Sequence, residues 1–225
     1  MRYLMHQAQA GQRAETLVVL LPGAYHQPED FIKEGFVSAV HDRQLQIDLM
    51  MAELSFDHIA DQTALTEIHH DLIQPAINKG YKNIWLAGIS IGGYVAIAYA
   101  NRYPLQLAGL LLLAPYPGNR ITTGEIVSAG GIQAWSPPFI ADDDIELGNW
   151  YWLKNNANAE RIEVHLGYGE DDRFADSHLM MAQTLPAARL DKISGGHVWP
   201  VWLQLWHHFL DKRFVKEPFV ETRYE

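Results

Sequence analysis

Short apolar runs alternate along this chain with segments in which apolar residues recur every three or four positions. Such runs are typical of buried strands, and such segments are typical of amphipathic helices. The runs that predict strands span 16–21, 45–54, 83–88, 107–115, 161–167 and 189–194. The segments that predict helices span 28–43, 63–79, 91–104 and 199–214. Strands that alternate with helices predict an α/β fold, in which a mostly parallel sheet is flanked by helices.

One long segment, 116–160, interrupts this alternation. It contains glycines, prolines and three consecutive aspartates, together with the aromatic residues Trp135, Phe139, Trp150, Tyr151 and Trp152. A connection of this length is usually either a functional insertion or poorly ordered. Because its aromatic side chains favour packing, we interpret 116–160 as a small cap or lid inserted in one domain. With no internal repeat or linker-like stretch in the sequence, that single domain is predicted to span 1–225.

A serine flanked by glycines stands where a predicted strand meets a predicted helix. The segment Gly88-Ile89-Ser90-Ile91-Gly92 has the pattern G-x-S-x-G. In a strand–turn–helix setting this pattern is typical of a nucleophile elbow, a sharp turn that needs small residues on both sides of the serine. The hydroxyl then projects from the carboxyl end of the strand, where open parallel sheets bind their ligands. The alternative is a glycine-rich turn that contains a serine by chance.

A serine hydroxyl is a weak nucleophile and needs a base, usually a histidine that a carboxylate orients. Asp171 and Asp172 lie in the loop after the strand predicted at 161–167, and His197 follows the strand predicted at 189–194. The carboxyl ends of parallel strands meet at one edge of a sheet. We therefore expect Ser90, His197 and one of the two aspartates to lie together there.

The order Ser90, Asp172, His197, with the serine in G-x-S-x-G among alternating strands and helices, resembles the α/β-hydrolase superfamily. The resemblance extends from about residue 16 to about residue 212. It implies that Ser90 is the nucleophile, His197 the base and Asp172 the acid of a catalytic triad. The family often has a glycine three residues before the acid, and Gly169 matches that spacing for Asp172; Asp171 is the alternative.

The same resemblance implies an oxyanion hole made of two backbone N–H groups. One belongs to Ile91, directly after the nucleophile, and the other comes from the loop at 20–27. Many relatives have His-Gly in that loop, whereas this chain has Pro22-Gly23, so Ala24 is the best match and Tyr25 stays open as the donor. The absence of an H-G-G-G run argues against the hormone-sensitive-lipase type of esterase.

These features together predict a serine hydrolase of the carboxylesterase type, which cleaves a small-molecule ester through an acyl-enzyme. Tyr25, and Trp199 close to His197, are candidates for the substrate pocket and would give it an aromatic wall, as would the aromatic residues of 116–160. Those aromatic residues could equally hold the insertion in place. Thioester or amide hydrolysis and acyl transfer to an alcohol use the same groups, and a non-catalytic protein that binds a small molecule is the alternative from another class.

The composition of the chain limits which ligands and partners the protein is expected to bind. A net charge of −10 argues against nucleic acid and anionic membranes, because both select basic surfaces. The chain has no cysteine, which excludes disulfides, cysteine nucleophiles and thiolate metal sites. No histidine pair has the spacing of a helical metal site, and Asp142–Asp144 fit a solvated loop better than a calcium site. We expect no metal and no cofactor.

The apolar segments and the C-terminal tail bear on where the protein is found and how it assembles. The first residues lack the apolar stretch of a secretory signal, and no segment approaches the roughly 18 apolar residues of a membrane span. We therefore expect a soluble cytoplasmic protein. The tail at 216–225 contains Pro218 and alternates in polarity, so it could be extended and pair with a second copy; a homodimer stays open.

Overall fold

A computed structural model of the chain describes residues 1–55, 58 and 63–215. Its centre is a seven-stranded sheet in the order β1-β3-β2-β4-β5-β6-β7. The strands are β1 (Tyr3–His6), β2 (Thr16–Leu21), β3 (Ile47–Ala52), β4 (Asn83–Ile89), β5 (Gly109–Leu113), β6 (Glu163–Gly169) and β7 (Leu190–Ile193). Neighbouring strands run parallel, except that β1 pairs antiparallel with β3 at the edge. The predicted fold class, a mostly parallel sheet flanked by helices, is confirmed.

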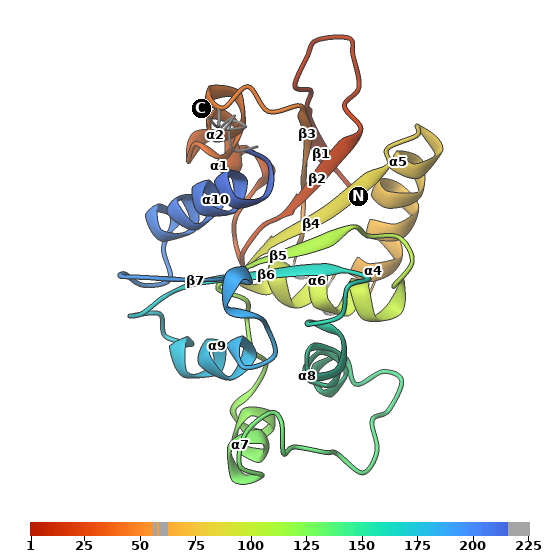
Figure 1. Cartoon of the computed structure of the whole chain (residues 1–225). Helices are drawn as coiled ribbons and strands as arrows, with labels where there is room; N and C mark the ends of the chain where they lie inside the picture. Colours follow the sequence, from red (N-terminus) through yellow and green to blue (C-terminus); the bar gives the residue numbers. More distant parts are fainter. Residues whose placement is uncertain (56–57, 59–62, 216–225) are drawn as a thin grey trace, which may run out of the picture.

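Helices cover both faces of this sheet (Figure 1). One layer contains α1 (Pro28–Lys33), α2 (Phe36–Asp42) and α10 (Trp199–Arg213). The other layer contains α4 (Ala64–Glu67), the π-helical turn η1 (Ile68–Ile73), α5 (Gln74–Asn78), α6 (Ile91–Arg102), α8 (Ile145–Asn156) and α9 (Ala175–Ala182). The short 3₁₀ turn η2 (Ala187–Arg189) leads into β7, and α7 (Arg120–Ser128) lies outside α8 and α9.

Two predicted helices differ from those observed, for local reasons. The segment 28–43 forms two helices because Gly35 takes φ = 93° between them, and this left-handed conformation ends the first helix. The segment 63–79 stays helical throughout but widens to a π turn in its middle. Pro75 lies two residues after the end of that turn and has no N–H to donate to the helix hydrogen-bond ladder. The pattern of apolar and polar residues along the chain did not predict β1 or α9.

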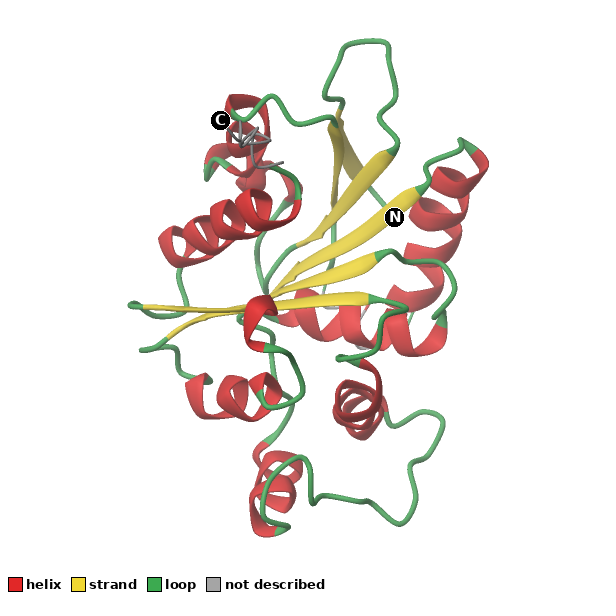
Figure 2. Cartoon of the chain, in the orientation of Figure 1, coloured by secondary structure: helices red, strands yellow, loops and turns green. Residues whose placement is uncertain are grey.

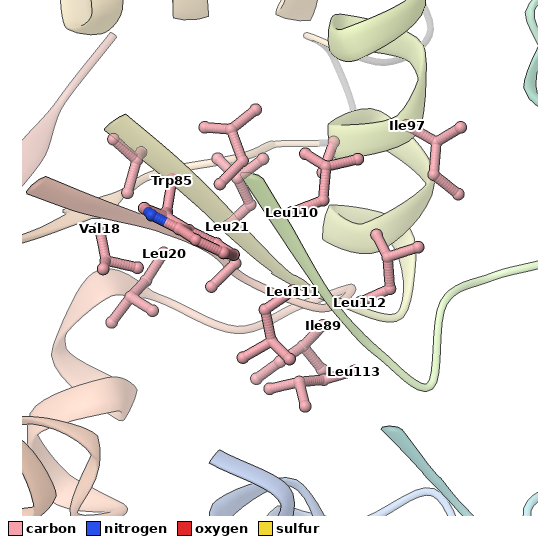
Figure 3. Packing of buried hydrophobic residues seen from close by; sticks show 14 of the residues in the cluster. Val18, Leu20, Leu21, Trp85, Ile89, Ile97, Leu110, Leu111, Leu112 and Leu113 are labelled. Atoms are coloured by element: carbon pink, nitrogen blue, oxygen red, sulfur yellow. The ribbon is translucent and has the colours of Figure 1, made fainter. Parts of the chain in front are cut away.

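The central strands are buried on both faces, as crossover helices require. Val18, Leu20 and Leu21 of β2, and the leucines of β5, pack against Trp85 and Ile89 of β4 (Figure 3). Trp85 lies over Gly109, where a Cβ would come within 2.3 Å of the indole. This packing fixes the carboxyl ends of β4 and β5 relative to each other, and those ends position the site described below.

The segment 116–160 contains α7, α8 and the long loop that joins them (Figure 2). Trp135, Trp150 and Trp152 are buried, whereas Phe139 and Tyr151 are exposed. The indole of Trp150 donates a hydrogen bond of 2.8 Å to the carbonyl oxygen of Pro117. Most of the aromatic area of this segment is therefore used to fasten it to the sheet domain.

Two further expectations concern membrane-spanning helices and the C-terminal tail. None of the helices among the described residues combines the length and apolarity that crossing a membrane would require. The predicted extended tail at 216–225, on which the homodimer option depended, lies outside the described residues.

Candidate active site

Ser90 lies at the turn between β4 and α6, with φ = 52° and ψ = −116°. A positive φ is strained for a residue with a side chain, and such strain is concentrated at functional sites. The Ser90 N–H donates to the carbonyl oxygen of Leu113 on β5 at 3.0 Å, which holds the turn in place. A Cβ on Gly88 would lie 2.3 Å from the carbonyl oxygen of Gly92, and one on Gly92 would lie 2.3 Å from that of Leu21. Glycine is therefore required at both positions.

His197 lies in the loop between β7 and α10, and its Nε2 is 2.9 Å from Oγ of Ser90. This loop passes very close to the end of β6, since a Cβ on Gly169 would lie 2.0 Å from the carbonyl oxygen of Gly195. Gly195 itself has φ = 115°, a conformation that other residues rarely adopt. The two glycines allow the loop to turn back over the sheet edge, so that the imidazole reaches the serine.

Asp172 lies in the loop after β6, and its Oδ2 is 2.7 Å from Nδ1 of His197. Its Oδ1 accepts a hydrogen bond of 2.9 Å from the backbone N–H of Phe174, and its side chain is fully buried. Asp171 makes a different contact: its Oδ2 accepts from the N–H of Gly195 at 3.1 Å. Of the two aspartates that the sequence left open, Asp172 contacts the imidazole, and Asp171 fastens the loop that carries it.

The charge state of Asp172 determines the tautomer of His197. Burial raises the pKa of the Asp172 carboxyl, but the hydrogen bonds from His197 and from the Phe174 N–H outweigh burial and hold that pKa below its usual value. An ionised carboxylate only accepts hydrogen bonds, so the proton of the neutral imidazole lies on Nδ1. Nε2 is then the acceptor for the Ser90 hydroxyl.

Two aromatic rings hold the His197 imidazole from its sides. The centroid of Phe174 is 5.5 Å from that of His197, the centroid of Trp202 is 5.0 Å away, and both interplanar angles are 88°. These edge contacts restrict rotation of the imidazole out of line with Ser90. The loop after β6 and the first turn of α10 thus both position the same side chain.

The loop after β2 forms a tight turn beside Ser90. The N–H of His26 donates to the carbonyl oxygen of Gly23 at 3.2 Å, with Ala24 and Tyr25 between them. Tyr25 has φ = 66°, which is the positive value that the third residue of a type II turn requires. On the other side, Ile91 is the first residue of α6, where an N–H has no acceptor within the helix. The loop after β2 and the N–H of Ile91, which the sequence associated with an oxyanion hole, therefore both lie next to Ser90.

A cavity of about 460 Å³ opens next to the serine. It is lined by Gly23, Ala24, Tyr25, His26, Ser90, Arg173, His197, Val198, Trp199 and Trp202. Tyr25 and Trp199, the two residues predicted for the pocket, are in this lining. In the part of the chain that the structure describes, residues of 116–160 are absent from the lining, so its aromatic wall comes from α10 instead.

Sequence reasoning missed His26, Arg173, Val198 and Trp202 as lining residues. Helix periodicity offered a signal for Trp202, because it lies three residues after Trp199 on the same face of α10. Burial lowers the pKa of His26, with a further contribution from the nearby His197, and its ring packs 4.8 Å from that of Trp199. His26 is thus a neutral part of the wall.

The three aspartates 142–144 lie elsewhere. They border a separate cavity of about 600 Å³ between α6 and the insertion, together with Arg102. Within the described ranges, groups of three or more His, Asp or Glu residues with the geometry to hold a metal ion are absent.

The fold is shared with known enzymes. Solved structures that are similar to this chain include a ferulic acid esterase (TM-score 0.62, 15% identity, covering 92% of this chain and 89% of that one). An S-formylglutathione hydrolase from Staphylococcus aureus has a TM-score of 0.58 at 15% identity, covering 88% of this chain and 80% of that one. An α/β hydrolase enzyme from a lagoon-sediment metagenome has a TM-score of 0.58 at 18% identity, covering 94% of each chain. No protein-family model and no curated protein matches the sequence. At these identities the similarity shows the α/β-hydrolase fold.

Proposed function

We propose that this protein is a serine hydrolase that cleaves a small-molecule carboxylic ester through an acyl-enzyme. The observation that carries the proposal is the continuous chain of contacts from Ser90 Oγ to His197 Nε2 at 2.9 Å and from His197 Nδ1 to Asp172 Oδ2 at 2.7 Å. The esterases and hydrolases among the structures of the same fold support it. Among the reactions that a serine, a histidine and an aspartate catalyse together, hydrolysis of a carboxylic ester is the commonest.

In the first half-reaction, His197 Nε2 takes the proton of the Ser90 hydroxyl while Oγ attacks the carbonyl carbon. The negative charge that develops on the carbonyl oxygen is stabilised by backbone N–H groups, for which we propose Ile91 and Ala24. Collapse of the tetrahedral intermediate breaks the ester bond, and the proton on Nε2 passes to the leaving alcohol. Asp172 keeps the imidazole in the required tautomer and stabilises its charged form.

In the second half-reaction, His197 removes a proton from water, which attacks the acyl-enzyme. The carboxylic acid leaves, and the proton returns to Ser90 Oγ. The low pKa of Asp172 suits this role, because the carboxylate must stay ionised while the imidazole gains and loses a proton. The edge contacts from Phe174 and Trp202 favour the proposal further, since the imidazole must keep its orientation through both half-reactions.

A fluorophosphonate probe tests the nucleophile directly. We expect stoichiometric addition of one phosphonyl group at Ser90, seen by intact mass and peptide mapping, and none in the Ser90→Ala variant. The matched control is Ser128→Ala at the exposed end of α7, which should label like the wild type. Hydrolysis of a nitrophenyl ester should fall by about 10⁴- to 10⁶-fold in Ser90→Ala.

The labelling result separates the proposed enzyme from a non-catalytic binding protein. A wild-type chain that binds small molecules but takes up no phosphonyl group would contradict the proposal. So would a Ser90→Ala variant that keeps more than about a tenth of the turnover, because removal of the nucleophile of a triad costs orders of magnitude. Circular dichroism of each variant shows that the fold is intact.

A further inference from the structure

Among the described residues that line the cavity beside Ser90, Arg173 is the one with a permanent charge. It directly follows Asp172, so its position is tied to the proposed triad. The Asp172 carboxylate is buried behind His197 and is not itself part of the lining. A ligand in the cavity therefore meets a guanidinium and does not meet a carboxylate.

The guanidinium of Arg173 forms no ion pair and no hydrogen bond with the described residues of the protein. Across residues 1–55, 58 and 63–215, carboxylates lie outside ion-pair distance of its guanidinium, and its N–H donors make no hydrogen bond. Its guanidinium carbon lies 4.8 Å from the centroid of Phe174, the ring whose edge contacts His197. The arginine is thus held over an aromatic platform beside the base, with its donors available to a ligand.

Another part of the lining is aromatic. Trp199, Trp202 and the neutral His26 form one aromatic cluster, with ring centroids 4.8 to 5.8 Å apart. The protein as a whole carries a net charge of −10 and would repel an anion. A lone cation in the lining changes that locally, and a guanidinium matches the two oxygens of a carboxylate with two parallel N–H groups.

We propose that the ester cleaved at Ser90 carries a carboxylate that binds Arg173, while its apolar part packs on the Trp199–Trp202 wall. This inference rests on the proposed function and specifies its substrate class as acidic esters. Arg173 acts here as a specificity residue, through binding of a group remote from the scissile bond. Binding of the substrate's carboxylate to Arg173 raises kcat/KM for charged esters relative to neutral ones.

Matched ester pairs test the inference on both sides of the scissile bond. One pair is the nitrophenyl half-ester of adipic acid, whose acyl part carries the carboxylate, and its methyl ester. The other is acetoxynitrobenzoate, whose leaving group carries the carboxylate, and its methyl ester. The measured quantity is the ratio of kcat/KM for the charged ester to that for its neutral partner, after subtraction of the spontaneous rate.

We expect Arg173→Gln to lower this ratio by about five- to fiftyfold in at least one pair, because a charge-assisted contact is lost. Arg173→Lys keeps the charge and should recover part of the ratio. The control Arg161→Gln removes one positive charge from an exposed turn outside the cavity and should leave the ratio as in the wild type. Added salt should lower the ratio more in the wild type than in Arg173→Gln, because the exposed charge of Arg173 is screened while the rest of the protein's charge is the same in both.

The outcomes distinguish this inference from the proposed function. An unchanged ratio in Arg173→Gln for both pairs, or an equal fall in Arg161→Gln, overturns the acidic-ester inference while ester hydrolysis at Ser90 stands. A wild-type chain that cleaves none of the four esters and takes up no fluorophosphonate overturns both. A ratio that falls only in the Arg173 variant and partly recovers with lysine supports the inference.

Discussion

Near each end of β6 a carboxylate lies 2.7 Å from a histidine nitrogen, and the two pairs differ in almost every other respect. At the start of the strand, Nε2 of His165 contacts Glu163, whose other oxygen accepts from Arg213 at 2.9 Å. After the end of the strand, Asp172 contacts His197. The second nitrogen of His165 is buried without a partner among the described residues, whereas that of His197 faces Ser90.

The comparison shows that a histidine–carboxylate pair does not by itself make a site. His165 lies between Trp85 and Phe209, with ring centroids 6.1 and 5.1 Å away, and it is not among the described residues that line the cavity beside Ser90. His197 lies at the carboxyl edge of the sheet, where parallel strands leave their loops and a cavity opens. Position at that edge separates a pair suited to catalysis from a pair suited to packing.

The largest expected difference is in catalysis. Asp172→Asn should lower kcat for a nitrophenyl ester by about 10³- to 10⁴-fold, because the amide favours the wrong imidazole tautomer. Glu163→Gln breaks the other pair and should leave kcat within about twofold, while it lowers the free energy of unfolding by about 1–2 kcal/mol. Steady-state kinetics and urea unfolding measure the two effects. A Glu163→Gln variant that loses as much activity as Asp172→Asn would remove the distinction between the ends of β6.

Much of the fold followed from periodicity, because its central strands are continuous apolar runs. The run 16–21 coincides with β2, and the alternation of elements gave the parallel sheet. The edge strand β1 was missed because it has four residues and only one side of it is partly buried. The break between α1 and α2 depends on one backbone angle at Gly35, which the helical pattern on both sides concealed.

The site was predictable to the level of loops and less so to the level of atoms. The motif around Ser90 and the order of Asp172 and His197 indicated which strand ends to consider, and the roles of these residues stay predictions. The choice between Asp171 and Asp172 depended on the turn after β6, where the N–H of Asp172 donates to the carbonyl oxygen of Gly169 at 3.2 Å. Spacing alone does not show which neighbouring side chain turns inward. Arg173 was missed for the same reason.

A smaller effect should appear in the pH dependence of stability. Burial lowers the pKa of His165 below its ordinary value of 6.5, and the nearby Glu163 only partly opposes this. The unfolded chain therefore binds more protons than the folded chain below pH 6.5, so the free energy of unfolding should fall as the pH drops from that value. In His165→Gln this part of the decline should be absent, and urea unfolding at a series of pH values between 7.5 and 5 compares the slopes.

One outcome of these unfolding measurements would contradict the prediction for His165. Buried His178, whose Nε2 donates to the carbonyl oxygen of Pro115 at 2.9 Å, has a pKa that burial lowers as well, so the variant keeps some acid sensitivity. Slopes that are identical in wild type and His165→Gln would mean that burial does not keep His165 neutral in the folded protein. Activity at pH 7.5 should be similar in the two proteins, since His165 does not line the cavity.

The smallest expected effect concerns the end of β6 beside Ser90, where Asp171 and Asp172 are neighbours with different contacts. Asp171→Ala removes the acceptor for the Gly195 N–H, but the backbone hydrogen bond from the Asp171 N–H to the Gly195 carbonyl oxygen at 3.0 Å still holds the loop. We expect kcat to fall by only about two- to tenfold, as the loop of His197 gains some freedom. Asp171→Asn keeps an acceptor oxygen and should restore most of that loss. If instead Asp171→Ala were as damaging as Asp172→Asn, and asparagine restored nothing, a negative charge at residue 171 would be the one that the imidazole requires.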